Sequence, residues 1–358
     1  MINIHIRPHW EISWKGERPL DTADLLGLLL AIQDTGSIAQ AAKAVRLSYR
    51  YAWGLLRSAE ELFGQELLHT GRGRGTALTP LAQKLVWADR RIAARLSPTL
   101  QSLASELEVE LARVTGVALR PLRLDASHGF AVAALLGCID RDALPLDSRY
   151  RTSTDAVAAL ARRECDLAGF HVPRGRFQAQ TASWYRRWLD PGAHCLVRVA
   201  GRQQGLITAR GNPLGLHLLS DLARPGVRFV NRQVGSGTRM LLEMMLAADG
   251  PPPESIQGFN SAEFTHSAVA AYIASGMADA GVGMRAAAAQ FKLDFVPLVD
   301  ETYYFALRRD ALDEPAMHQL LELMRTPHYL ALVAALPGYD ARGTGEIVEI
   351  EEAFASQA

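Results

Sequence analysis

From Pro121 onward, short apolar runs alternate with stretches of helical periodicity, and this alternation constrains the fold more than any other feature. Short apolar runs bounded by glycine or polar residues are typical of buried strands, whereas the longer amphipathic stretches are typical of helices. The alternation favours parallel sheets with helices on their faces. The predicted strands are 122–127, 166–172, 194–200, 204–209, 227–231, 280–284, 294–299 and 303–308. The predicted helices are 154–164, 237–249, 265–276 and 315–336.

Small polar residues stand at four junctions where a predicted helix begins. In parallel sheets, ligands lie at the carboxyl ends of strands, and the first N–H groups of a helix attract anions. Several helix starts that converge on one cleft could hold a desolvated anion with little formal charge. The four junctions are ASHG (126–129), TSTD (152–155), GSGTR (235–239) and FTHS (264–267).

The N-terminal third has a different pattern. Alternating apolar residues in 2–6 and 10–14 predict two short strands that form a hairpin. Three helices follow, and a tight turn between the second and the third predicts a helix-turn-helix. Trp53 is expected to pack as core beneath the third helix. The helix starts are Asp21 or Thr22, Ser37 and Ser48, and the helix stops are Gly36 and Gly64.

Positive charge is concentrated in this part of a chain whose formal net charge is zero. Residues 43–95 contain ten Lys and Arg and four acidic residues, which is typical of a segment that meets a polyanion. Arg72 and Arg74 stand between glycines after the third helix. We expect them at the tip of a β-wing, where they could track phosphates or enter a minor groove.

The stretch TGSIAQAAKAVRLSYRYAW (35–53) resembles the DNA-binding domain of ModE-type and LysR-type bacterial regulators. The resemblance covers about residues 18 to 95. It implies a winged helix-turn-helix that binds double-stranded operator DNA with its recognition helix in the major groove. The residues assigned to DNA are Ser37, Ser48, Tyr49, Arg50 and Arg57, together with Arg72 and Arg74 of the wing.

A long connecting helix is predicted after Thr79-Pro80, because apolar residues recur mostly at three- and four-residue steps as far as Val114. Pro98 is expected to interrupt it, with a restart at Ser97-Pro98. The helix could pack on its own domain or join two copies of the chain, and we favour a homodimer. The predicted domains are a DNA-binding domain (1–79), a connecting helix (80–119) and an effector domain (120–358).

Four stretches of the C-terminal part, 155–173, 204–216, 229–243 and 265–284, resemble a type II periplasmic-binding-protein fold. They look most like the PBP-like domain of molybdate-related regulators, akin to molybdate- and tungstate-binding proteins. The resemblance implies two α/β lobes with the ligand between them. Lobe I would comprise 120–205 and 297–358, and lobe II would comprise 206–296.

The same resemblance assigns ligand-binding residues at the four junctions and on a returning strand. The arginines and histidines among them exceed what a neutral oxyanion cage needs, so sulfate, formate or another small anion stays open beside molybdate and tungstate. The assigned residues are Ser127, His128, Ser153, Thr154, Arg232, Ser236, Gly237, Thr238, Arg239, Thr265, His266 and Tyr303.

Motifs of enzyme chemistry are missing. The sequence has no P-loop and no G-x-S-x-G elbow, and GVGMRA (281–286) lacks the βαβ context of a dinucleotide site. No Cys/His cluster has zinc spacing, so we expect no metal, no cofactor and no enzyme. The three separate cysteines are expected to be reduced, and no signal peptide or apolar span is found.

The sequence therefore predicts a multidomain protein: a winged helix-turn-helix, a connecting helix and a two-lobed α/β effector domain. Its predicted function is that of a cytoplasmic transcriptional regulator that senses a small oxyanion, with molybdate or tungstate as first choice, and that does not associate with membranes. The alternatives are a sensor of another small anion and a small-anion storage or homeostasis protein.

Overall fold

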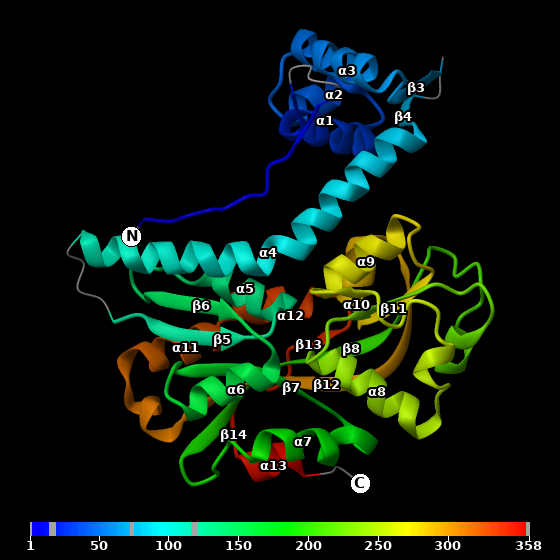
Figure 1. Ribbon diagram of the computed structural model, residues 1–358. Helices are drawn as coiled ribbons and strands as arrows, with labels where there is room; N and C mark the ends of the chain where they lie inside the picture. Colours follow the sequence, from blue (N-terminus) through cyan, green and yellow to red (C-terminus); the bar gives the residue numbers. More distant parts are fainter. Residues whose placement is uncertain (1, 14–18, 72–74, 116–119, 356–358) are drawn as a thin grey trace. The chain divides into compact units, whose positions relative to one another are not determined.

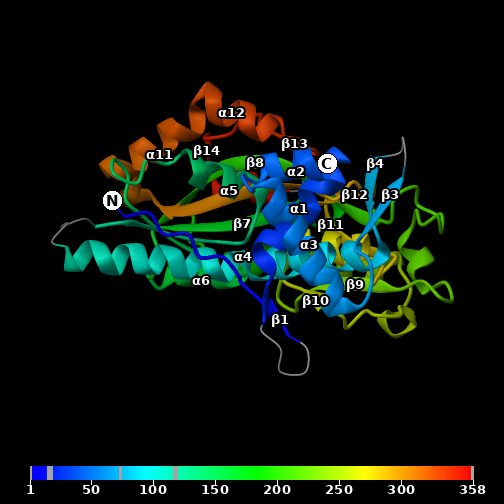
Figure 2. The same ribbon diagram turned by 90° about the horizontal axis from the view of Figure 1, so that it is seen from above.

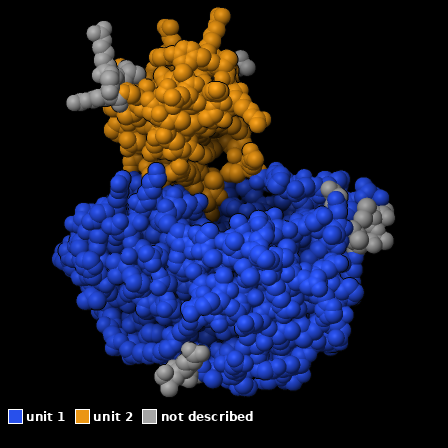
Figure 3. Space-filling view, turned by 180° about the vertical axis from the view of Figure 1, so that it is seen from behind, with its two compact units in different colours: residues 1–6, 95–358 blue, residues 7–94 orange. Residues whose placement is uncertain are grey.

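The computed structural model describes residues 2–13, 19–71, 75–115 and 120–355 (Figure 1). They form two compact units, one of residues 7–94 and one of residues 1–6 with 95–358, coloured separately in Figure 3. The boundary between the units falls inside helix α4 (Pro80–Val114). The predicted domain limits of 1–79, 80–119 and 120–358 stay predictions.

The smaller unit is built on three helices, α1 (Thr22–Thr35), α2 (Ile38–Ala44) and α3 (Tyr49–Phe63). Each begins at a side-chain cap, because Asp21, Ser37 and Ser48 accept hydrogen bonds from backbone N–H groups of the following turn. Gly36 and Gly64 end α1 and α3 in the left-handed conformation that glycine adopts at little cost. The predicted caps and stops are confirmed.

The core of this unit joins the inner faces of these helices to the first turns of α4. Leu29 and Ile32 of α1, Leu56 of α3 and Val86 of α4 are among its buried members. Trp53 does not join them, since 43% of its surface is exposed and its ring lies edge-on to Tyr49. The prediction for Trp53 was wrong because the buried stripe of α3 is narrower than expected and follows Ala52, Leu56 and Ala59.

Two short antiparallel pairs complete the smaller unit. Strands β3 (Leu68–Gly71) and β4 (Gly75–Leu78) form the predicted wing, whose tip residues Arg72 and Arg74 lie outside the described residues (Figure 2). The predicted N-terminal hairpin of 2–6 with 10–14 was wrong, because β1 (Glu11–Ile12) pairs with β2 (Leu20–Asp21), a strand that was not predicted. The predicted strand at 2–6 does not form, and the N–H of Ile4 instead donates to Glu108.

Helix α4 has 35 residues and begins as predicted, with the Thr79 hydroxyl accepting from the N–H of Ala82. It contains Pro98 without a break in the helix, so the predicted interruption at Ser97-Pro98 was wrong. Its residues up to Ala94 belong to the smaller unit, and those from Arg95 onward to the larger one. Among the described residues, no helix is both long and apolar enough to cross a membrane.

The larger unit is organised around one mixed sheet with the order β10-β9-β11-β8-β12-β7-β5-β6, in which β13 and β14 also pair with β8. Neighbours are parallel at the two ends and antiparallel around β8 and β12. The strands are β5 (Leu122–Ala126), β6 (Leu146–Tyr150), β7 (Leu167–Pro173), β8 (His194–Thr208), β9 (Phe229–Arg232), β10 (Ala262–Glu263), β11 (Ala280–Met284), β12 (Asp294–Arg308), β13 (Tyr339–Asp340) and β14 (Ile347–Val348).

Two features of this sheet differ from the prediction. The runs predicted as four separate strands at 194–209 and 294–308 form the two continuous strands β8 and β12, which pair with each other over almost their whole length. Strand β6 was not predicted. The prediction of parallel sheets holds for the two ends of the sheet but not for its middle, where β8 and β12 run antiparallel to each other and to their neighbours.

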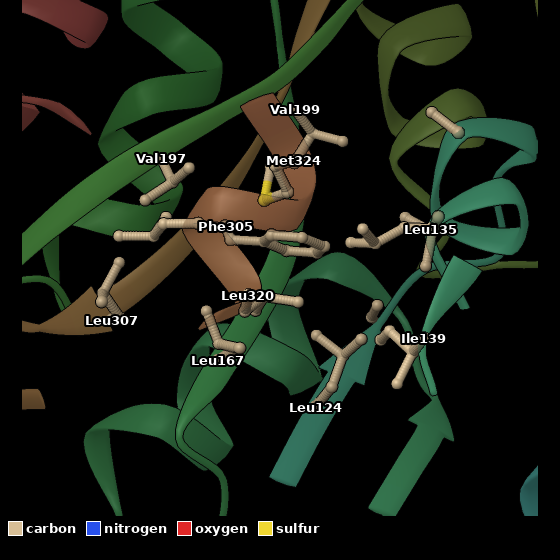
Figure 4. Close-up of a cluster of buried hydrophobic side chains, with 14 of the residues drawn as sticks. Leu124, Leu135, Ile139, Leu167, Val197, Val199, Phe305, Leu307, Leu320 and Met324 are labelled. Atoms are coloured by element: carbon tan, nitrogen blue, oxygen red, sulfur yellow. The ribbon is translucent and has the colours of Figure 1, made fainter. Parts of the chain in front are cut away.

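Helices cover both faces of the sheet (Figure 1). These helices are α5 (Phe130–Cys138), α6 (Ser153–Ala161), α7 (Gln178–Arg186), α8 (Gly237–Asp249), α9 (His266–Ala274), α10 (Arg285–Gln290), α11 (Pro315–Arg325), α12 (Pro327–Ala334) and α13 (Ile350–Phe354). A cluster that includes Phe305, Leu320 and Met324 fills one face of lobe I (Figure 4). A separate cluster, with Phe229 and Leu242, fills lobe II. Each lobe therefore has its own core.

Candidate functional site

A cavity of about 650 Å³ lies within the larger unit, between lobe I, lobe II and the second part of α4. It contains eight of the twelve predicted ligand residues, and His171 and Arg202 lie beside them. The eight are Ser127, His128, Ser153, Arg232, Ser236, Gly237, Thr238 and His266.

Three helices present their N-terminal ends to this cavity. Ser153, Gly237 and His266 are the first residues of α6, α8 and α9, and all three line it. The first N–H groups of a helix have no partner within the helix, and they carry the positive end of its dipole. Three helix starts on one cavity make an environment that favours an anion.

Arg232, the last residue of β9, places a buried cation in the cavity. Its side chain is 7% exposed, and neither its Nε nor its Nη1 has a hydrogen-bond partner among the described residues. Burial and the nearby charge of Arg202 lower the pKa of the guanidinium to about 9. A buried guanidinium without hydrogen bonds is costly, so this position calls for an anionic partner.

Arg202 of β8 differs from Arg232 because its charge is already compensated. Its Nε donates to Glu301 of β12, which also accepts from Gln204. The guanidinium lies over the ring of Tyr303, 4.9 Å from the ring centroid. Arg202 therefore has a structural role in the wall of the cavity, whereas Arg232 supplies the positive charge that a ligand would neutralise.

Three histidines, His128, His171 and His266, line the cavity as neutral groups. Burial lowers the pKa of His128 and of His171 to about 4 and holds that of His266 well below its usual range, with nearby arginines adding to the effect. His171 Nδ1 is 3.2 Å from the Ser153 hydroxyl. His171 Nε2 and His266 Nδ1 have no hydrogen-bond partner among the described residues. Nε2 of His171 is packed against Gly237 and lies 3.9 Å from Glu301 Oε2, so His266 Nδ1 is the one of the two that a ligand could use.

Gly237 allows a close contact between α8 of lobe II and β7 of lobe I. A Cβ atom built on this residue of α8 would collide with the ring of His171 from β7. The absence of a side chain therefore lets the N-terminus of α8 approach lobe I closely.

Four predicted ligand residues lie outside the cavity lining. Arg239 is directed away from it, since its guanidinium donates to Glu243 and to the carbonyl of Phe259. Thr265 caps α9 by accepting from the N–H of Ala268, and the hydroxyl of Thr154 lies 3.2 Å from that of Thr152. Tyr303 donates to the carbonyl of Ser127, so it positions Ser127.

The predictions missed several lining residues. His171 was visible in the sequence as a polar residue inside the apolar run 166–172, a pattern that marks a buried polar site. Arg202 stands in the polar stretch between the runs 194–200 and 204–209, so no such pattern marked it. Other missed residues, which include Arg95, Thr99 and Ser102, come from α4. The spacing of apolar residues in α4 does not indicate which part of the larger unit the helix packs against.

In the smaller unit, the start of α3 forms an exposed surface. Tyr49, Arg50 and Trp53 are exposed there, and Ser48 is exposed as the cap. Arg57 is also exposed but forms an ion pair with Glu61, and Ser37 is the half-buried cap of α2. Charged and aromatic side chains thus share the face of α3 that the resemblance assigns to the major groove.

Residues 139–325 match the model of the PBP superfamily domain, and residues 23–83 match that of the bacterial regulatory helix-turn-helix of the lysR family. Since the first of these models covers more than half of the chain, the chain belongs to the PBP superfamily. The chain thus joins a LysR-family helix-turn-helix to a PBP-like domain.

Curated relatives match parts of the chain. YvgK of Bacillus subtilis is 30% identical over 200 residues, and these are 56% of this chain and 64% of YvgK. The molybdenum-pterin-binding protein MopB of Rhodobacter capsulatus is 32% identical over 210 residues, which are 56% of this chain and 75% of MopB. The chain thus spans less than two thirds of the length of YvgK.

Solved structures of full-length regulators are similar at low identity. A mutant of OxyR from Corynebacterium glutamicum has a TM-score of 0.43 at 16% identity and covers 87% of this chain and 94% of its own. LysG of the same organism with bound effector Arg has a TM-score of 0.42 at 16% identity and covers 87% of this chain and 98% of its own.

Proposed function

We propose that this regulator binds a small oxyanion, molybdate or tungstate, in the cavity between its lobes, and that the anion changes its affinity for operator DNA. The observation that carries the proposal is the buried guanidinium of Arg232, which has unpartnered N–H groups and faces the same cavity as three helix N-termini. An oxyanion accepts hydrogen bonds on every oxygen and supplies the missing negative charge. The relative MopB is a molybdenum-pterin-binding protein by name, which supports this choice of anion.

The ligand would be held mainly by Arg232 and by backbone N–H groups. The Ser236 hydroxyl already donates to the carbonyl of Gln233 and accepts from the N–H of Arg239. It therefore shapes the first turn of α8, whose N–H groups at Gly237 and Thr238 lie at the free end of the helix. Ser127, Ser153 and the neutral histidines complete the proposed site.

A thermal-shift panel of the full chain with molybdate, tungstate, sulfate, phosphate and formate tests the proposal. A ligand at 100 times its Kd stabilises the folded state by about 2.7 kcal/mol. We expect molybdate and tungstate to raise Tm most. Stabilisation by sulfate or formate instead would change the assigned ligand, and no stabilisation by any of the five would contradict the proposal.

The volume of the cavity favours a second candidate, an oxyanion that carries an organic group. Four oxygens at the volume of a water molecule, about 30 Å³ each, fill only roughly a fifth of about 650 Å³. The name of MopB, a molybdenum-pterin-binding protein, joins molybdenum to a pterin. Adding a pterin phosphate ester to the panel separates the two candidates, because a larger shift than with molybdate would favour the organic ligand.

Operator binding is tested by gel shift with the DNA upstream of the gene. Sequence-selective binding that weakens with salt is expected for a helix-turn-helix that contacts phosphates. The absence of such binding would favour a storage or homeostasis protein.

A further inference from the structure

Two histidines, His128 and His266, lie near Arg232 in the cavity. His128 precedes α5, and His266 is the first residue of α9. Both line the cavity, and the positive charge of Arg232 lowers the pKa of both rings. A proton on His128 also disfavours a proton on His266, so the two rings hold one proton more easily than two. We refer to His128 and His266 as the histidine pair.

Neither ring of the histidine pair is bonded to another side chain. Nδ1 of His266 is buried and has no hydrogen-bond partner among the described residues. The ring of His128 packs against Tyr150, with the ring centroids 5.1 Å apart, and has no hydrogen bond to the described part of the chain. His171 differs, because its Nδ1 lies 3.2 Å from the hydroxyl of Ser153. The histidine pair is therefore the part of the wall that can change its protonation for a ligand.

The fixed charges around the histidine pair add up to a single positive charge. Arg202 forms an ion pair with Glu301, and Arg95 Nε lies 3.9 Å from Glu263 Oε2. Arg232 is the third guanidinium, and the Glu263 carboxylate raises its pKa against the lowering by burial and by Arg202. Three arginines and two glutamates leave one net positive charge on the walls.

The other charged residues near the cavity are either paired or exposed, so their partners and water screen them. Strand β11, against which α9 packs, has no ionisable side chain. Arg239 of α8 forms an ion pair with Glu243. The remaining pairs are Arg149 with Asp147 and Arg151 with Asp125, and the exposed residues are Glu106, Asp155 and Arg285.

We propose that a dianion enters this cavity together with one proton, which the histidine pair takes from the solvent. This inference rests on the proposed function. Molybdate, tungstate and sulfate carry two negative charges, whereas the walls supply one net positive charge. A buried charge without a counter-charge is costly, so the bound dianion favours a second cation beside Arg232. The ring that gains the proton changes from a neutral imidazole to an imidazolium, and both of its nitrogens then donate hydrogen bonds.

The proton makes the affinity for the dianion depend on pH. Without ligand, burial and Arg232 lower the pKa of His128 to about 4, and the pKa of His266 is also well below its usual range, so the histidine pair is neutral near pH 7. The bound dianion acts in the opposite direction and raises the pKa of the pair. Binding is therefore tighter at low pH and weakens as the pH rises.

Isothermal titration calorimetry of the full chain with molybdate tests this inference. The titration is made at pH 6.5 in MES and in imidazole buffer, whose ionisation enthalpies differ, so the difference in heat gives the number of protons taken up. We expect roughly half a proton to one proton per molybdate, and Kd should rise about three- to tenfold per pH unit between pH 6.5 and 7.5. Equal heats in the two buffers would contradict the inference.

The double variant His128→Gln with His266→Gln removes the histidine pair but keeps polar side chains. Its molybdate binding should take up no proton, and its Kd should change by less than about 1.5-fold per pH unit. His318→Gln, which changes an exposed histidine of α11, should keep the wild-type uptake. Wild-type uptake in the double variant would contradict the assignment of the proton to the pair. The comparison of buffers on the wild type needs no variant, so it decides whether a proton enters even if the double variant does not fold.

The outcomes separate the two proposals. If no oxyanion of the panel stabilises the wild type, the proposed function and this inference are both contradicted. If molybdate binds the wild type with equal heats in both buffers, only this inference is contradicted.

Discussion

At the scale of single residues, the charge of Arg232 determines what the cavity can bind. In Arg232→Gln a buried cation is removed whose Nε and Nη1 lack hydrogen-bond partners among the described residues, so the free energy of unfolding without ligand should rise by about 1 kcal/mol or more. The stabilisation by molybdate should disappear. Urea unfolding with and without molybdate measures both effects, and the exposed Arg210→Gln in the same lobe is the control. If molybdate still stabilised Arg232→Gln, the anion would be bound by groups other than the guanidinium of Arg232.

The cavity histidines make stability depend on pH. The pKa values of His171 and His128, about 4 when folded, lie below the unfolded value of about 6.5, so the unfolded chain binds more protons between these limits. Stability is therefore complete above about pH 6.5 and falls as the pH decreases, by at most about 1.4 kcal/mol per pH unit for each histidine. Urea unfolding between pH 7.5 and 5 should show this slope. His171→Gln should reduce it, and the exposed His318→Gln should leave it unchanged.

At the scale of elements, the N-terminus of α8 depends on a position without a side chain. Gly237→Ala places a methyl group against the buried ring of His171, which should destabilise the fold by about 1–3 kcal/mol and weaken oxyanion binding. Gly137→Ala, in helix α5 with open space around its Cα, should stabilise slightly. Equal stability of the two variants by urea unfolding would show that α8 does not need this close approach.

Helix α3 should carry sequence recognition. Arg50 is exposed near its N-terminus, and the loss of a base contact costs about 1–3 kcal/mol. Arg50→Ala should therefore weaken operator binding roughly tenfold or more while Tm changes little. The charge-matched Arg113→Ala should not weaken it. If the operator affinity of Arg50→Ala were unchanged in a gel shift, Arg50 would not contact bases in the major groove.

At the scale of the whole molecule, an exposed apolar row on α4 supports a homodimer. Leu96, Leu107, Leu111 and Val114 are 38–84% exposed. Leu107→Glu combined with Leu111→Glu should produce a monomer in sedimentation analysis and lower operator affinity. Leu332→Glu changes a comparably exposed leucine outside α4 and should leave the assembly intact. A double variant that sediments like the wild type would place the interface elsewhere.

The order of most elements and the caps of α1, α2 and α3 could be predicted from the sequence, but the tertiary arrangement of the elements could not. Ser37 and Ser48 were found because a cap is a local bond between a side chain and its own backbone. Arg239 lies outside the cavity lining because the rotation of α8 turns its third residue toward Glu243, and no local pattern indicates that rotation. His171, Arg202 and the α4 residues were missed because their convergence depends on strand order and on helix docking.

The most direct test of the central claim is an anomalous difference map from crystals of the full chain grown with tungstate, recorded at a tungsten absorption edge. The account predicts one strong peak inside the cavity, between the guanidinium of Arg232 and the N–H groups of Gly237 and Thr238. A map with no peak there, or with peaks only on the outer surface, would contradict it.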